Sequence, residues 1–377
     1  MASGGEPSWA WLGLLKWSLS YSDGTRPSSE TMKPLSPEDK AFLEEVMKDG
    51  IINEGERMKT ILAELADTLE VLKAKAEGKQ VGEEKKELSD EEMAERMREL
   101  RDIVEQIDYA RAFMSLGGLT FLLGCAAEQG VVPTPFRASC LAVLATMCQN
   151  NPPVQLNMLE KGSIVALSDL YFSELEYEKN VLKEERSAHS NLRTRLVQAF
   201  SCSVRNHEIA EDLFCRNENA VRVIESGLAS ASPLALQKRA LFFFRALVTS
   251  DTCSRERMHI FARSLAHVCE TRLTEDTDPE LRELSLDLLT EILRQKKGVN
   301  TILDRRNDMV TMGIGRVSAI RALKGEEREY ADVELKHWED LITELARAEP
   351  DSDEQTNPEP LLIEAPKAVD NNETVSE

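Results

Sequence analysis

The sequence has few aromatic residues and no long apolar run. Phe, Trp and Tyr make up 5% of its 377 residues, although 42% are hydrophobic. Because β-sandwiches draw on aromatic and β-branched residues, this composition favours stacked helices. No run of 18 apolar residues is present, and the stretch from Trp9 to Leu19 lacks the flanks of a signal peptide. We therefore expect no membrane contact and a cytosolic or nuclear location, and we predict a cytoplasmic protein.

Positive charge is also scarce. The chain has 46 Lys and Arg against 67 Asp and Glu, a formal net charge of −21, and such a chain repels nucleic-acid phosphates. Its seven cysteines are odd in number and lack CxxC spacing, and its five histidines do not cluster with them at ligand spacing. We expect reduced, buried thiols, no metal site, no cofactor and no nucleic-acid partner.

The motifs of common catalytic sites are missing. The sequence has no P-loop, no dinucleotide-binding glycine motif and no HExxH, and Gly313 and Gly315 are expected between helices. A Cys–His pair could form in space from Cys202 or Cys253 with His259, but Cys202 falls in a periodic helix, which is typical of a core residue. We predict that the protein is not an enzyme.

The composition changes along the chain and predicts four parts. Residues 1–35 are expected to be flexible around one short amphipathic helix. Residues 36–113 are a charged helical region that caps the body, with a capping box at Ser89 opening one of its helices. Residues 114–347 form the apolar body. Residues 348–377 are an acidic tail that we expect to be disordered, because it cannot bury enough apolar area to offset its ordering entropy.

The body contains a repeated apolar pattern with the phase i, i+1, i+4, i+5, i+8, a broad stripe on one helix face. The four stretches begin at Cys140, Leu196, Ala240 and Leu284, at intervals of 56, 44 and 44 residues. The charged stretch 173–187 is the expected insertion in the first interval. The underlying unit is then about 44 residues long, within the range of armadillo and HEAT repeats.

Each unit also has helical pieces before this stripe. Gly117 and Gly162 suit tight turns between a short helix and the next one. Three helices per unit predict an all-α, armadillo-like α-solenoid rather than a HEAT-like one. In such a stack the third helices, which carry the stripes, line a concave surface.

Polar residues follow the stripes at repeat-equivalent positions and are expected to share one rim. They either bind a partner in the groove or cap the helix ends. They are Gln149, Asn150 and Asn151, then Arg205, Asn206 and His207, then Thr249, Ser250 and Asp251.

Four groups of short stretches, spread over roughly residues 10–250, stand out by their order and spacing. They are Leu14-Leu15-Lys16-Trp17-Ser18-Leu19 with Asp23-Gly24-Thr25, Ile107-Asp108-Tyr109-Ala110 with Gly117-Gly118-Leu119, Gln149-Asn150-Asn151-Pro152, and Cys202-Ser203-Val204-Arg205-Asn206. Together they resemble one armadillo family, the Hsp-binding-protein-one and Fes-one group, cytosolic nucleotide exchange factors of the heat shock protein 70 chaperone. The insertion at 173–187 and the acidic tail depart from the family pattern, and the last repeats match it only in periodicity.

The resemblance implies a monomeric co-chaperone that performs no chemistry itself. In this family the concave surface grips a lobe of the chaperone's ATPase domain and distorts it, so that ADP leaves. The alternative is a generic armadillo scaffold for other proteins or extended peptides. The Trp ladder of the nuclear-import armadillo adaptors is missing from the third helices, which makes nuclear-signal binding a weaker candidate.

The resemblance also implies partner-binding residues. Ala110 stands where the family has a small residue against the partner, so a bulky replacement is expected to obstruct docking. Arg205 ends a third helix and can fork onto a carboxylate of the partner, or form an ordinary surface salt bridge. The second-tier candidates are Asn150, Asn151, Asn206 and His207.

The amino-terminal segment carries bulky apolar side chains in a context expected to be flexible. It either mimics a chaperone client and enters the substrate groove, or docks as a helix on the protein's own body. The residues concerned are Trp11, Leu14, Leu15 and Trp17.

Overall fold

The structure is a computed structural model that describes residue 37 and residues 53–79 and 87–351. This part of the chain contains eighteen helices and no strand, which confirms the predicted all-α class. The chain divides into two compact units, residues 1–89 and 90–377. The amino-terminal helix predicted within 1–35 and the acidic tail beyond 351 lie outside the described residues.

The first unit is described mainly through one long helix, α3 (Glu54–Ala76). Its Asn53 side chain caps the helix by accepting a hydrogen bond from the Glu56 backbone N–H at 3.2 Å. After the helix the chain returns, and the Leu88 N–H donates to the Thr68 hydroxyl at 3.2 Å. Leu88 is buried there, together with an apolar stripe of α3 that includes Leu65.

The second unit begins with α4 (Asp90–Val104), which starts directly after the capping-box residue Ser89 as predicted. Helices then follow in groups of three. The first group is α5 (Ile107–Ser115), α6 (Gly118–Ala127) and α7 (Thr134–Cys148). The second is α8 (Pro152–Glu160), α9 (Ser163–Asn180) and α10 (Lys183–Val204). The third is α11 (Glu208–Arg216), α12 (Glu218–Leu228) and α13 (Leu234–Val248).

Two further groups complete the stack. The fourth is α14 (Arg255–Ile260), α15 (Ala262–Thr271) and α16 (Pro279–Gln295). The fifth is α17 (Val299–Leu303), α18 (Arg306–Ala322) and α20 (Asp332–Arg347), with the short α19 (Glu326–Tyr330) before α20. The sequence-based boundary between residues 113 and 114 falls inside α5, so the stack begins earlier than the boundary suggests.

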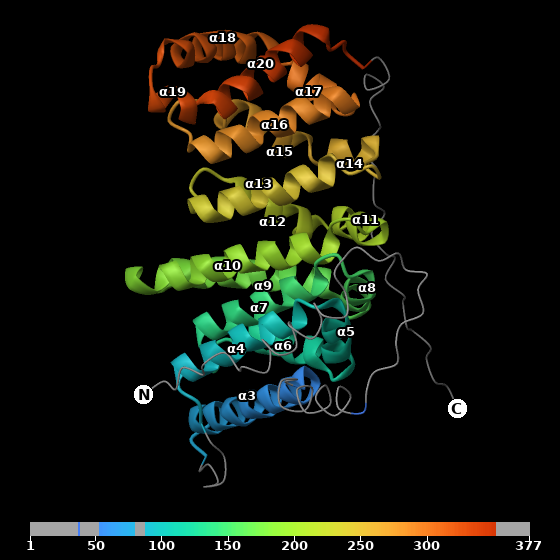
Figure 1. The fold of residues 1–377 in the computed structure, drawn as a ribbon, viewed down its shortest axis with the longest axis vertical. Helices are drawn as coiled ribbons and strands as arrows, with labels where there is room; N and C mark the ends of the chain where they lie inside the picture. The colour runs from blue at the N-terminus through green and yellow to red at the C-terminus, as the bar shows by residue number, and fades with distance from the viewer. Residues whose placement is uncertain (1–36, 38–52, 80–86, 352–377) are drawn as a thin grey trace, which may run out of the picture. The chain divides into compact units, whose positions relative to one another are not determined.

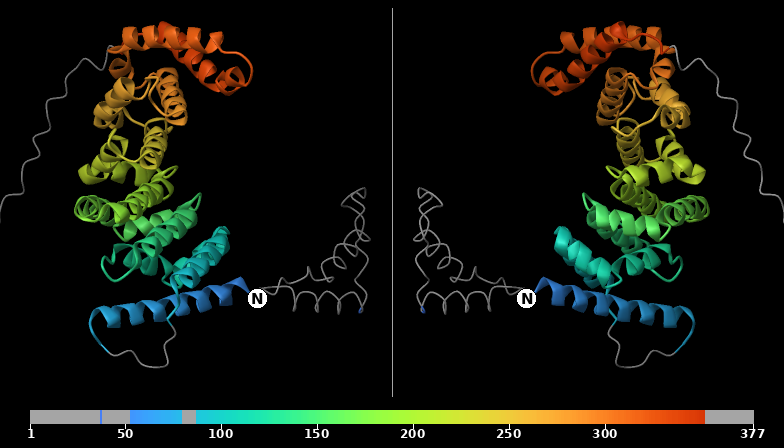
Figure 2. Two further views of the ribbon diagram at one scale, coloured as in Figure 1. Left: turned by 90° about the vertical axis from the view of Figure 1, so that its left-hand side faces the viewer. Right: turned by 90° about the vertical axis from the view of Figure 1, so that its right-hand side faces the viewer.

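The third helices of the groups are the four stretches that the apolar pattern aligned. Helices α4, α7, α10, α13, α16 and α20 pack against one another in that order (Figure 1). Figure 2 shows that this second unit curves, with these helices on the inner side of the curve. We call the surface that they expose the inner face.

One register prediction was wrong. The fourth stripe was placed at Leu284, yet Leu284 is partly exposed, whereas Ser285 and Leu286 are fully buried. The helix start explains the shift, because Asp278 precedes α16 as Pro133 precedes α7 and the equivalent of Cys140 is then Ser285. The Ser285 hydroxyl satisfies its own burial by donating to the Leu281 carbonyl at 2.8 Å.

Left-handed residues make the turns between helices. Gly117 (φ 87°) and Gly162 (φ 70°) precede α6 and α9, as the sequence predicts. Asn150 (φ 53°) and Asn206 (φ 60°) take the same conformation after α7 and α10. Asparagine tolerates this region better than most residues, so these two asparagines have a local structural role.

The sequence predicted Gly313 and Gly315 between helices. This prediction was wrong, because both glycines lie within α18. A Cβ atom on Gly313 would lie 2.9 Å from the Trp338 ring, so glycine lets α20 approach closely. The insertion at 173–187 lengthens two helices, giving α9 18 residues and α10 22, whereas α12 and α13 have 11 and 15.

Within the described ranges, no single helix is long and apolar enough to cross a membrane; α5 and α6 reach that length only together and are bent by 77°.

Candidate functional site

Ala110 is not on the surface. Its exposed fraction is 1%, because its helix α5 turns this residue toward the core, as it does Phe113. In the conformation described here, a partner has no access to the Ala110 side chain. Its assignment to a docking surface remains a prediction, and a bulky residue at this position would first disturb the packing of α5.

The polar residues after the third helices mostly serve the helix ends. The Asn206 N–H donates to Glu211 Oε1 at 3.1 Å, and His207 Nδ1 accepts from the Ala210 N–H at 3.3 Å, which caps α11. Asn151 is 1% exposed, and its Oδ1 accepts from Arg111 Nε at 3.3 Å. The capping alternative therefore describes these residues, and Asn150 and Asn206 alone among the second-tier candidates are well exposed.

Arg205 has a different environment. Its Nε donates to the Ser201 carbonyl at 3.1 Å, and its guanidinium lies 4.7 Å from the ring centroid of Phe242 on α13. Gln155 on α8 fixes the backbone, because its Nε2 donates to the carbonyls of Cys202 and Arg205 at 2.9 and 3.0 Å. Arg205 forms no ion pair with any described residue, so the surface salt bridge expected as its alternative role is not formed there.

Further arginines lie beside it on the inner face. Arg101 of α4 donates from Nε to the Thr146 hydroxyl at 3.1 Å, and Arg195 of α10 donates to Gln198 Oε1 at 2.8 Å. Burial lowers the pKa of Arg195, and the positive charges of Arg101 and Arg239 lower it further, which places the three groups close together. We call Arg101, Arg195, Arg205 and Arg239 the arginine cluster.

The thiol of Cys202 lies within this cluster. Burial raises its pKa, although the neighbouring charges of Arg205 and Arg239 act in the opposite direction. Burial also raises the pKa of Cys253, the other cysteine considered for a Cys–His pair. Because the thiolate is the reactive form, neither residue is an activated nucleophile. Six of the seven cysteines are buried free thiols, as expected, and Cys202 is partly exposed.

At the next boundary along the inner face, between α13 and α16, cations are paired with carboxylates. Lys238 of α13 pairs with Asp278 at 2.9 Å and with Glu280, and Arg245 pairs with Asp287 at 2.7 Å. Cations therefore meet carboxylates between α13 and α16, whereas cations meet cations between α10 and α13. Within the described residues, none of the four arginines of the cluster is paired with a carboxylate.

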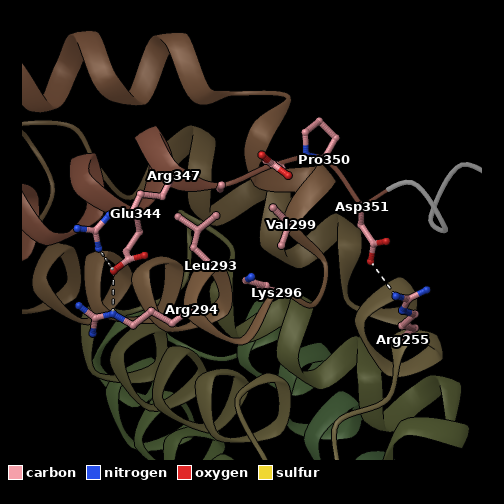
Figure 3. A pocket seen from close by; sticks show the side chains of 11 residues that line it. Arg255, Leu293, Arg294, Lys296, Val299, Glu344, Arg347, Pro350 and Asp351 are labelled. Carbon is pink, nitrogen blue, oxygen red and sulfur yellow. Dashed lines mark hydrogen bonds and ion pairs between the residues drawn. The ribbon is translucent and has the colours of Figure 1, made fainter.

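A separate cavity of about 670 Å³ lies beside α14, α16 and the end of α20 (Figure 3). Its arginines have partners, because Arg255 pairs with Asp351 at 3.2 Å, Arg294 pairs with Glu344 at 3.4 Å and Arg347 pairs with Glu344 at 3.8 Å. One wall is the chain's own segment 348–351. Because its arginines are already paired, this cavity is a weaker candidate for a binding site than the inner face. No group of three metal-ligating side chains is found among the described residues.

Two residues of the arginine cluster could have been found from the repeats in the sequence, but the search for apolar residues did not consider them. Arg195 and Arg239 immediately precede Leu196 and Ala240, so they occupy the same position in two repeats. Arg101 and Phe242 carry no comparable signal. The proposed client-mimic residues Trp11, Leu14, Leu15 and Trp17 lie outside the described residues.

Two comparisons with known proteins gave matches. Among solved structures, a crystal structure of an engineered protein from the Northeast Structural Genomics Consortium is similar, with 14% identity and a TM-score of 0.49, over 69% of this chain and 92% of that one. No curated protein matches the sequence. Residues 12–113 match the family model for the nucleotide exchange factor Fes1, which confirms the resemblance seen in the sequence. This match shows that the amino-terminal part of the chain, residues 12–113, is similar to the Fes1 family of nucleotide exchange factors.

Proposed function

We propose that this protein binds the ATPase domain of a heat shock protein 70 chaperone through its inner face and promotes the release of ADP. The observation that carries the proposal is the Fes1 match over residues 12–113, followed in the same chain by a curved stack of helix triplets. We further propose that it acts in the cytoplasm, as a monomer and without a cofactor.

The inner face has the size that a protein partner needs. A helix of 15 residues is about 22 Å long, and neighbouring helices pack about 9 Å apart. Six such helices, from α4 to α20, therefore present on the order of 1,000 Å². A standard protein interface takes about 800 Å² from each partner, so a lobe of a globular domain fits this surface.

Exchange by this route needs no chemistry in the chain. The protein promotes ADP release if it binds the open state of the ATPase domain more tightly than the ADP-closed state. It can shift that equilibrium only by the ratio of the two affinities. Linkage then requires ADP to weaken the binding of this protein by the factor by which this protein weakens the binding of ADP.

Stopped-flow release of a fluorescent ADP analogue from the purified chaperone tests the proposal. We expect faster release in the presence of the protein, and calorimetric titrations should give a lower affinity when ADP saturates the chaperone. An unchanged release rate, or equal affinities with and without ADP, would contradict the mechanism.

A generic scaffold for other proteins or extended peptides is the alternative function. A pull-down from lysate distinguishes the two, because an exchange factor should retain a heat shock protein 70 chaperone that ATP releases. For the amino-terminal segment we propose client mimicry. Deletion of residues 1–35 should then slow the release of peptide from the chaperone and leave ADP release unchanged, and unaffected peptide release would contradict it.

A further inference from the structure

We propose that the arginine cluster is the electrostatic anchor of the inner face, and that it binds a group of carboxylates on the partner protein. This inference rests on the proposed function, because it names the chemistry by which that partner is recognised. It assigns roles to Arg101, Arg195 and Arg239, which the sequence did not single out.

The first support is geometric. The cluster spans four successive inner-face helices: α4, α10 and α13 supply the arginines, and α7, between α4 and α10, contributes Thr146. The guanidinium groups of Arg101 and Arg195 bond only to neutral acceptors, Thr146 and Gln198. Within the described ranges, none of the four arginines pairs with a carboxylate. Their bonding capacity toward an anion is therefore unused.

The second support is energetic. The chain as a whole carries a net charge of −21, so carboxylates are abundant, and inner-face cations such as Lys238 and Arg245 are paired with them. Between α10 and α13 the fold instead places like charges close together in a partly desolvated position, which disfavours the charged forms. A partner carboxylate relieves this repulsion, and arginine provides the planar fork that binds a carboxylate through two hydrogen bonds.

The surroundings limit what kind of anion fits. The next boundary exposes Asp278, Glu280 and Asp287, whose charges repel a long polyanion such as a nucleic acid. On the other side, Phe242 is 37% exposed beneath the guanidinium of Arg205, which adds an apolar contact. A compact acidic patch on a folded protein, next to apolar surface, matches this combination.

The cluster would also fix the position of the partner along the stack. The arginines of the cluster are unpaired at the α10–α13 boundary, whereas the cations at the α13–α16 boundary are paired. An acidic patch of the partner therefore finds its most favourable electrostatic interaction at the α10–α13 boundary. Electrostatic complementarity of this kind sets register and association rate more than total affinity.

The test uses the full-length chain and the purified ATPase domain of the chaperone. Arg195→Gln, Arg239→Gln and the double variant remove positive charge and keep polar side chains of similar reach. Arg216→Gln is the matched control: it removes the same charge from a side chain that is 78% exposed on α11 and already paired with Asp212. Affinity and ADP release are measured at several salt concentrations, and thermal unfolding checks the fold.

We expect the double variant to lose about tenfold or more in affinity at low salt, because it removes two charge-assisted hydrogen-bonding groups. We also expect its affinity to depend less on salt than that of the unmodified protein. Arg216→Gln should stay within about twofold, as is usual for an exposed pair. The midpoint temperature of thermal unfolding should be unchanged or slightly higher, since the variants relieve repulsion between the arginines.

Two outcomes would overturn the inference, and they are distinguishable. If the unmodified protein accelerates ADP release and the double variant does so equally, with the same salt dependence, the anchor is wrong and the proposed function stands. If the unmodified protein neither binds the ATPase domain nor accelerates release, both fail together.

Discussion

The guanidinium of Arg205 stacks on the exposed ring of Phe242, 4.7 Å from the ring centroid. Arg205, the residue that follows α10, is thereby held against α13. The Gln155 side chain on α8 donates a hydrogen bond to the Arg205 carbonyl and fixes the backbone there. A cation–π contact of this kind contributes about 0.5–1 kcal/mol at an exposed site and restricts the guanidinium to one direction. The guanidinium of Arg205 is thus held by Phe242 and by the Ser201 carbonyl, without a carboxylate partner among the described residues.

We predict that Arg205→Ala reduces the acceleration of ADP release about tenfold, because it removes one charge-assisted hydrogen-bonding group that is already in place. Circular dichroism should show unchanged helicity, since the side chain is partly exposed. Arg205→Lys should give an intermediate loss, because it keeps the charge without the planar fork. Equal exchange rates for all three proteins would show that Arg205 does not contact the partner.

Ala110 gives a contrasting prediction. Because its exposed fraction is 1%, Ala110→Arg forces a long cation into the packing of α5 and should cost about 3 kcal/mol or more of folding stability. Ala112→Arg is the control, since Ala112 lies on the exposed side of the same helix. Thermal unfolding should be lowered for the first variant and nearly unchanged for the second. A stable Ala110→Arg protein that fails to bind the chaperone would instead restore the docking role expected from the sequence.

The sequence predicted the third helices well because their apolar stripes are strict. The stripes starting at Cys140 and Leu196 are buried, the stripe starting at Ala240 is buried except for Arg245, and the turn glycines are where they were expected. The fourth stripe slipped by one residue because Ser285 counts as polar in a hydrophobic pattern. In the fold it is fully buried and bonded to the Leu281 carbonyl.

The candidate site was harder to predict. A charged residue in a sequence looks the same whether or not a carboxylate is near it, and only the packing of α10 on α13 shows that Arg195 and Arg239 come from neighbouring helices and that each feels the charge of the other. Likewise, a small residue such as Ala110 is equally consistent with an interface and with a core. Capping was foreseen as the alternative role of Asn206 and His207, and the structure shows such bonds for the Asn206 backbone N–H and the His207 side chain, while their contact with a partner stays a prediction.

The surroundings of Glu334 allow a prediction of how acid changes the stability of the last helices. Arg282 and Arg316 each donate two hydrogen bonds to its carboxylate, at 2.8 to 3.1 Å, within a buried site. Burial raises the pKa of Glu334, but the bonds from Arg316 and Arg282 outweigh it and lower the pKa from 4.5 to about 2. A depressed pKa stabilises the fold above about pH 4.5, and this stabilisation is lost as the pH falls toward 2.

The shift corresponds to about 3 kcal/mol at neutral pH. Glu334→Gln should therefore lower the free energy of unfolding at pH 7, and the difference from the unmodified protein should shrink as the pH approaches 2. Glu339→Gln on the same helix is the control, since that side chain is 43% exposed. Denaturant unfolding at several pH values measures both, and a constant difference across this range would contradict the assignment.

Asn300 holds the chain that leaves α20. Its Nδ2 donates to the Asp351 carbonyl at 3.0 Å, and its Oδ1 accepts from the Asp351 N–H at 2.9 Å, so one side chain satisfies both backbone groups. We predict that Asn300→Ala releases this residue: the amide of Asp351 should exchange with deuterium about tenfold faster, as expected for the loss of about 1–2 kcal/mol of hydrogen bonding. Asn307→Ala, at an exposed position of α18, is the control and should leave the exchange unchanged. If Asp351 remains equally protected in Asn300→Ala, the ion pair with Arg255 holds the segment by itself, and the wall of the adjoining cavity does not depend on Asn300.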